Sequence, residues 1–334
     1  KVIGTTLDEK LYLAFEILDY ALLSAPGAPL KKALTDAGIG KDIMGSYDNG
    51  VYQPIFSVVA KNAEESQKDE FVKVIEDVLR DQVKNGINQK ALLAGINYNE
   101  FRYREADFGP YPKGLMYYLT MMDSWLYDET KPFIHIEAGD TFDELKKNAR
   151  NGYFEKLIKE YLLDNNHKSI ISLVPEYGLE KEKEQKEADK LAEYKSTLTN
   201  DELEELVKKT KELKEYQDTP SSQEDLEKIP MLELSDIKRE PAKDYNDVKS
   251  VDGIKIVHHN IFTNKIAYIN MSFDTKCVPD ELIPYMGLLG STLSLMDTKN
   301  YTYPELTNEI NINCGGLATG TALYSDKVDF SKNT

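Results

Sequence analysis

The sequence predicts an α+β protein in which helices cover one face of a sheet, followed by an antiparallel helical hairpin and an incomplete second α+β copy. Helical and alternating apolar patterns are mixed without a regular strand-helix-strand order, which is typical of this class. The same order of long buried helix, capped shorter helix, glycine stop and strand occurs in residues 8–60 and again in 280–324. Such a tandem repeat, in a chain of 334 residues, predicts two domains and a connector.

The first copy begins with Val2 and Ile3, which have the character of the end of a strand. A capping box over 6–9 and a wide apolar face predict a buried helix over 8–23. Pro29 suits the first turn of a short helix over 30–37, which Gly38 ends. Strands are then expected at 41–46 and 51–60.

Helices dominate the next hundred residues. Apolar residues at helical spacing predict helices over 64–84, 88–104, 112–126 and 153–163, and a capping box at Thr141–Glu144 opens another short helix. The apolar run 169–174, ended by Pro175, predicts a closing buried strand.

Residues 176–217 are crowded with Glu and Lys and contain two narrow apolar stripes. A capping box at Thr199–Glu202 separates the stripes, which are formed by Leu191, Tyr194 and Leu198 and by Leu203, Leu206, Leu213 and Tyr216. Each stripe can be buried only against the other or against a neighbouring domain, which predicts an antiparallel hairpin. The alternative is a solvated spacer.

The second copy follows a polar connection punctuated by prolines. Paired strands are expected at 253–259 and 264–273, a helix over 279–296, a helix opened by the capping box Thr302–Glu305, and a strand at 317–324. The expected domains are therefore 1–175, 176–246 and 247–334. The first copy lacks opening strands and the second lacks everything after its third strand, so the simpler interpretation is an excerpt of a longer protein.

The composition excludes several classes of function. A net charge of −17 offers no basic stripe for a phosphate backbone, which argues against a nucleic-acid partner. The two cysteines, Cys277 and Cys314, form neither a disulfide framework nor a zinc knuckle. No apolar run reaches the length needed to span a bilayer, so no membrane partner is expected. Residue 1 shows neither an initiator Met nor a signal peptide.

The segments that carry a family resemblance are 26–34 (PGAPLKKAL) running into 37–40 (AGIG), 279–285 (PDELIPY) and 303–306 (YPEL), with the acidic hairpin between them. Together they resemble the interior of an insulinase-type (pitrilysin) zinc metallopeptidase of the presequence-protease branch. The resemblance covers essentially the whole chain. It implies four homologous α+β domains that enclose a chamber in two halves joined by a helical hairpin. This chain then contains most of the second domain, the hairpin and the first part of the third domain.

That family needs the zinc motif H-x-x-E-H, with the glutamate as general base. The motif is absent from this sequence, whose histidines are His135, His167, His258 and His259. Adjacent residues of a strand point to opposite faces, so His258 and His259 cannot share a metal. The resemblance places the zinc helix upstream of residue 1 and the transition-state Arg and Tyr beyond residue 334. No catalytic or metal-ligating residue and no cofactor are therefore expected in this chain, while zinc belongs to the full-length parent.

The resemblance also implies a substrate-binding edge strand in the second domain, to which a peptide is added as an extra strand. Carried onto this sequence, the edge falls at Ile43, Met44, Gly45 and Ser46, where Gly45 has no side chain to obstruct an approaching backbone. The alternative is an ordinary turn before the strand at residue 51.

Two functional hypotheses follow from the resemblance. The first is a non-catalytic central part of a zinc metalloendopeptidase that degrades short unstructured peptides such as presequences. Its partners are the peptides and the N-terminal catalytic and C-terminal domains of the same protein, in the cytoplasm of a bacterium or in a eukaryotic organelle. The second is a binding or assembly module of the same fold without catalysis. An unrelated α+β protein with a coincidental repeat is a third possibility.

Overall fold

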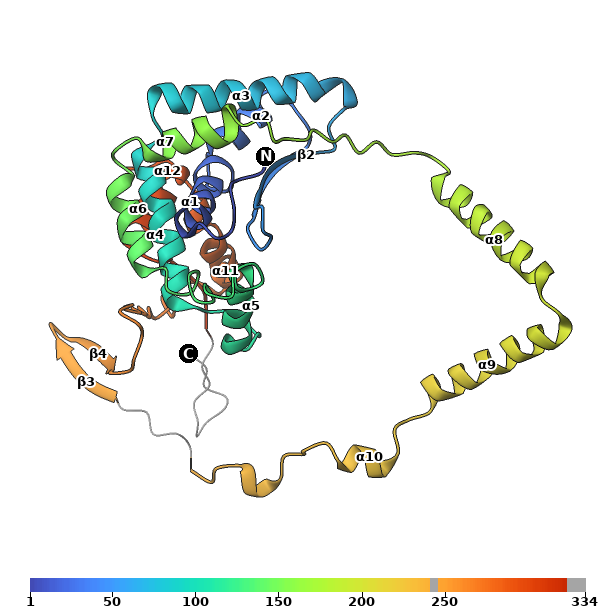
Figure 1. Cartoon of the computed structure of the whole chain (residues 1–334). Coiled ribbons are helices and arrows are strands. Elements are labelled where there is room, and N and C mark those ends of the chain that lie inside the picture. Colours follow the sequence, from blue (N-terminus) through green and yellow to red (C-terminus); the bar gives the residue numbers. More distant parts are fainter. Residues whose placement is uncertain (241–245, 323–334) are drawn as a thin grey trace. The chain divides into compact units, whose positions relative to one another are not determined.

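The computed structural model describes residues 1–240 and 246–322 (Figure 1). It divides into two units. The first is Lys1–Ser172 together with the described part of Phe262–Thr334, and the second is Leu173–Ile261. No helix within the described ranges is both long and apolar enough to cross a membrane.

The first unit is built around helix α1 (Glu9–Asp19), which continues as a π-helical turn, Tyr20–Ser24. Asp8 caps this helix, because its carboxylate accepts from the amides of Lys10 and Leu11 at 3.1 and 2.9 Å. The predicted capping box over 6–9 is therefore wrong: the Thr6 hydroxyl instead donates to the carbonyl of Asn49 at 3.0 Å. Seven of the eleven residues of α1 are buried, as the wide apolar face predicts.

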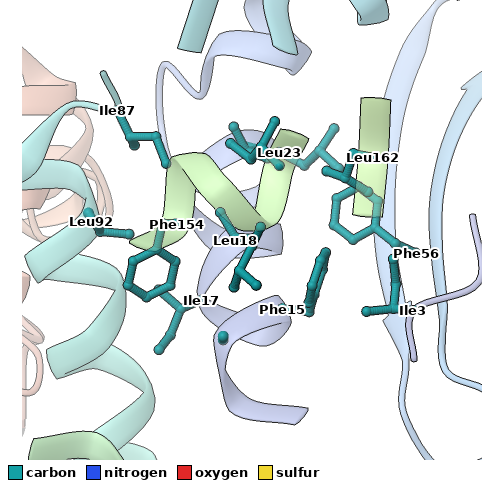
Figure 2. Packing of buried hydrophobic residues seen from close by; sticks show 14 of the residues in the cluster. Ile3, Phe15, Ile17, Leu18, Leu23, Phe56, Ile87, Leu92, Phe154 and Leu162 are labelled. Atoms are coloured by element: carbon teal, nitrogen blue, oxygen red, sulfur yellow. The ribbon is translucent and has the colours of Figure 1, made fainter. Parts of the chain in front are cut away.

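Further helices surround α1: α2 (Pro29–Asp36), α3 (Lys68–Asn85), α4 (Gln89–Glu105), α5 (Lys113–Trp125), α6 (Gly139–Asn148) and α7 (Tyr153–Leu157), with a 3-10 turn Glu65–Gln67 and a π-helical turn Ile158–Leu163. Figure 2 shows Phe15, Leu18 and Phe154 packed in the common core. The predicted helices are confirmed, but the box at Thr141–Glu144 is not, because α6 begins at Gly139 and Thr141 lies inside its first turn.

A two-stranded antiparallel sheet lies beside α1. Strand β1 (Asp42–Asp48) pairs with β2 (Ile55–Lys61) in a register that sets Met44 opposite Val59. Val2 forms a bridge to Ile55 on the other edge of β2. The strand predicted at 169–174 is wrong: this segment has no strand pairing and is exposed throughout, since its apolar residues find no partner strand among the described residues.

The later part of the first unit contains α11 (Ile283–Thr292), flanked by 3-10 turns Asp280–Leu282 and Leu293–Leu295, and α12 (Tyr303–Asn313). The capping box at Thr302 and Glu305 is confirmed. Helix α12 packs along α4, where the Asn97 side chain donates to the carbonyl of Ile312 at 2.9 Å. The strand expected at 317–324 is wrong for 317–322, which have no ladder partner, and residues 323 and 324 lie outside the described residues.

The second unit contains α8 (Leu179–Thr197), α9 (Asn200–Asp218), α10 (Gln223–Glu227), a 3-10 turn Leu234–Asp236, and strands β3 (Asn246–Val251) and β4 (Ile254–His259). The capping box of Thr199 and Glu202 is confirmed. The predicted pairing of the two long helices is wrong in the described structure, because stripe residues of both remain exposed, Leu191 by 58% and Leu213 by 55%. Two extended residues, Leu198 and Thr199, join the helices, and each stripe is too narrow to hold them together alone.

The β-hairpin of the second unit joins different strands from those predicted. Strand β4 pairs with β3, and Asp252 and Gly253 form the two-residue turn between them with φ of 49° and 80°. Positive φ at both central residues is the type I′ geometry that suits the twist of a hairpin. Residues 264–273 were expected to pair with 253–259, but they are not a strand in the described structure, and β4 pairs with β3 instead.

Candidate functional site

The proposed substrate edge, Ile43, Met44, Gly45 and Ser46, lies within β1. The side chains alternate, so that Ile43 is buried on the side of α1 whereas Met44 and Ser46 are not. Among the described residues no strand or other backbone group pairs with the outer edge of β1. These four residues therefore form part of a strand, not the turn that was the alternative, and the strand has an open edge.

Gly45 has a structural reason to lack a side chain. A Cβ atom built on Gly45 would lie 2.5 Å from Cδ1 of Leu23, 2.8 Å from Cβ of Leu23 and 2.7 Å from Oδ1 of Asp19. The glycine thus allows β1 to approach the end of the central helix closely. The space next to Gly45 is filled from within the protein, so this residue does not leave room for a ligand on that face.

Acidic side chains gather at the turn between β1 and β2. Glu16 of α1 accepts a hydrogen bond from the Asn49 side chain at 2.8 Å, and Asp123 of α5 accepts one from the Tyr12 hydroxyl at 2.9 Å. Burial raises the pKa of Glu16 to about 7, against the opposing effect of the hydrogen bond from Asn49. Burial also raises the pKa of Asp123, and the nearby charge of Asp48 adds to this effect. The carboxylates of Glu16 and Asp123 are therefore partly shielded from water beside this turn.

His135 lies next to this cluster and is a packed side chain. Its ring stacks on Tyr12 with the ring centroids 3.7 Å apart, and only 5% of its surface is exposed. Burial lowers the pKa of His135 to about 4, so the imidazole is neutral at physiological pH.

The described residues do not fit a zinc site. His258 and His259 are neighbours on β4, and within residues 1–240 and 246–322 no group of three His, Cys, Asp or Glu side chains is placed to hold a metal ion.

Sequence reasoning missed the acidic cluster. Tyr12 and Glu16 are four residues apart on a helix, and the spacing alone places them on one face. Their partners Asn49 and Asp123 come from a distant turn and a distant helix. The available signal was a glutamate inside an otherwise apolar helical face, which requires a polar partner when buried.

Comparison with known proteins places these features in a family. The family model described as peptidase M-16C associated matches residues 173–334. Protein HypA of Clostridium perfringens is 46% identical over 325 residues, which make up 97% of this chain and 33% of that protein. Presequence protease 1, chloroplastic/mitochondrial, of Arabidopsis thaliana is 31% identical over 317 residues, or 93% of this chain and 29% of that protein. The chain belongs to the insulinase family of peptidases, in the branch of the presequence proteases.

The similarity extends to more distant relatives of this branch. The mitochondrial presequence protease of Schizosaccharomyces pombe is 26% identical over 326 residues, covering 96% of this chain and 32% of that protein. The chain thus spans about a third of the length of the curated relatives it matches. The family expected from the four sequence segments is confirmed.

Proposed function

We propose that this chain is the central, non-catalytic part of a zinc-dependent metalloendopeptidase that degrades short unstructured peptides such as presequences. The observation that carries the proposal is the open outer edge of β1, in a chain related to proteins named presequence proteases. Zinc and its ligands belong to the rest of the polypeptide. The chain contributes a wall of the substrate chamber, an anchor for the peptide and the connection between the two halves.

The anchor is the edge formed by Ile43, Met44, Gly45 and Ser46. An extended peptide can continue the β1–β2 sheet here, because the outer backbone groups of β1 have no partner among the described residues. Main-chain hydrogen bonds of this kind bind peptides of many sequences, which suits an enzyme with unstructured substrates. The peptide must be unfolded, since a folded protein cannot offer a free strand.

Each predicted domain has its own role in this proposal. Residues 1–175 form the second peptidase-like domain, 176–246 the helical linker, and 247–334 the first part of the third domain. The long charged helices α8 and α9 serve as a strap that joins the halves, and their exposed stripes pack against the remaining domains. The protein acts in the cytoplasm if it is bacterial and inside an organelle if it is eukaryotic.

Backbone methylation of the peptide tests the edge. We would use the full-length polypeptide that carries this sequence and a series of peptides, each N-methylated at one successive residue. Only alternate amides of an added strand face β1, so we expect binding to fall about tenfold at every second position and to change little at the others. Equal losses of binding at all positions, or no loss at any position, would refute strand addition.

Catalysis is tested separately by assembling the parts. This chain, a separately produced N-terminal part and the remaining C-terminal part are mixed, and zinc-dependent cleavage of an unstructured peptide is measured. We expect cleavage only when all parts are present and expect a chelator to abolish it. Peptide binding without cleavage in the complete mixture would instead support a non-catalytic binding module of the same fold.

A further inference from the structure

Helix α5 has an apolar surface that the described residues leave uncovered. Only Ser124 of its thirteen residues is buried. Large apolar side chains of the helix and the following turn are between 37% and 63% exposed, namely Leu115, Tyr117, Tyr118, Leu119, Trp125, Leu126 and Tyr127. We call these seven residues the α5 wall. A helix that is apolar on several sides is normally covered, so the wall is a surface for another molecule or segment.

The wall is held at the end of β1 that carries Asp48. The rings of Tyr52 and Tyr127 lie 5.1 Å apart, which fixes the end of α5 to the segment between β1 and β2. The hydrogen bond from Tyr12 to Asp123 fixes the same end of α5 to α1. A peptide that pairs with β1 and continues beyond Asp48 therefore reaches the wall.

The charged side chains beside the α5 wall determine which peptide can bind there. The carboxylates of Asp48 and Asp123 both lie beside Gly50, since a Cβ atom built on this glycine would be 3.3 Å from Oδ1 of Asp123 and 4.0 Å from Oδ1 of Asp48. Asp128 and Glu129 follow directly after the wall. No Lys or Arg forms an ion pair with Asp48 or Asp123 in the part of the chain that the structure describes. A cation supplied by the ligand would relieve this repulsion.

We propose that the α5 wall, together with Asp48 and Asp123, is a specificity site for a peptide segment that combines large apolar side chains with a Lys or Arg. The inference rests on the proposed anchoring of peptides at β1 and adds a selectivity that main-chain pairing cannot provide. Apolar side chains of the peptide pack on the aromatic and leucine residues of α5. The basic side chain binds between the two carboxylates.

The charge is tested with two peptides that differ by one residue. Both contain the same apolar segment, and one carries a Lys where the other carries a Gln. Kd is measured by fluorescence anisotropy with the full-length polypeptide, with 1,10-phenanthroline present to prevent cleavage. We expect Asp48→Asn to raise the Kd of the Lys peptide about five- to tenfold and that of the Gln peptide less than about twofold. Equal effects on both peptides, or no effect on either, would overturn the charge selectivity.

The apolar wall is tested with Leu119→Ser and a matched control. Leu119 is 49% exposed on α5 and Leu226 is 46% exposed on α10, so both serines replace surface leucines. We expect Leu119→Ser to weaken the apolar peptides about fivefold and to leave an alanine-substituted peptide unchanged. Leu226→Ser should change the binding of neither peptide. If Leu119→Ser weakens the apolar and alanine peptides equally, or has no effect, the wall does not bind peptide.

Hydroxyl-radical footprinting distinguishes the peptide from another part of the polypeptide as the occupant. We expect Tyr118 and Trp125 to be labelled in the free full-length polypeptide and protected when the Lys peptide is added. Protection already present without peptide would show that the rest of the polypeptide covers α5, and would overturn the proposal. Alternating losses in the N-methyl series together with unaltered α5 variants would refute this inference while leaving the anchoring edge intact. Absence of any peptide binding would refute both.

Discussion

Replacing Gly45 by alanine should loosen β1 from the central helix. The added Cβ would meet Leu23 Cδ1 at 2.5 Å, and rotation of the leucine side chain can relieve that contact. It cannot relieve the contact with Leu23 Cβ at 2.8 Å, because this atom is fixed by the backbone. Leu23 is only 2% exposed and has little room to withdraw. Overpacking of this kind costs about 1–3 kcal/mol, and the preference of a strand for alanine over glycine offsets part of it.

Hydrogen–deuterium exchange of β1 measures this effect in the full-length polypeptide, where global unfolding is not a two-state process. A local loss of about 1.4 kcal/mol accelerates the exchange of the β1 amides about tenfold. Gly114→Ala in α5 is the matched control, since nothing lies within 4 Å of the atom it adds. It should leave the exchange of β1 unchanged.

A second substitution tests whether the contact with Leu23 causes the faster exchange of β1. Leu23→Ala alone should destabilise the core, because it opens a cavity beside β1. In the double variant with Gly45→Ala, the alanine methyl enters the space that Leu23 Cδ1 has left, so the combined loss should be about 1 kcal/mol smaller than the sum. Strict additivity, or unaltered exchange in Gly45→Ala alone, would refute the close packing described for this glycine.

Three further substitutions test other features of the described structure. Glu16 has a folded-state pKa of about 7 against an ordinary 4.5, so its stabilising contribution is full below pH 4.5 and is lost as the pH rises to 7. Glu16→Gln should therefore raise the free energy of unfolding by up to about 3 kcal/mol relative to the native protein across that range, measured by hydrogen–deuterium exchange of the α1 amides at a series of pH values. Glu100→Ala should lower the free energy of unfolding by about 1–3 kcal/mol in the same assay, because Glu100 is buried and accepts hydrogen bonds from Arg104 at 2.7 Å and from Lys146. Gly253→Ala should accelerate exchange in the β3–β4 hairpin several-fold, since φ at this position is 80°.

Helix ends were predictable from the sequence where the signal is local. A helix was expected over 88–104, and Asn88 caps the observed helix α4, accepting from the amides of Lys90 and Ala91 at 3.0 and 3.1 Å. The box of Thr302 and Glu305 was likewise found. Capping involves atoms within three residues of each other, so the sequence alone often predicts it. The box over 6–9 failed because a distant group, the carbonyl of Asn49, accepts from the Thr6 hydroxyl instead.

Strands were less predictable, because a strand exists only with a partner. The alternating apolar pattern of 264–273 has the same form as that of a real strand, but the strand that was expected to pair with it, β4, pairs with β3 instead. The deciding signal was Asp252–Gly253, a pair typical of two-residue hairpin turns, and it was overlooked in favour of the longer loop at 260–263. The acidic cluster around Glu16 was out of reach for a related reason, since its partner Asn49 is 33 residues away.

The repeat predicted from the sequence pairs one buried apolar helix with one that is exposed. Helix α1 packs against β1 and several helices, whereas α11 is more apolar and has no buried residue. Leu288 and Leu289 are 59% and 47% exposed. If a sheet elsewhere in the full-length polypeptide covers α11 as β1 covers α1, Leu288→Ser should cost about 1–3 kcal/mol in the full-length polypeptide and less than about 0.5 kcal/mol in the 334-residue chain. Exchange of the α11 amides in both proteins measures the difference. Equal small effects in the two would show that α11 faces solvent in the complete protein as well, and the two copies would then differ in architecture despite their shared order of elements.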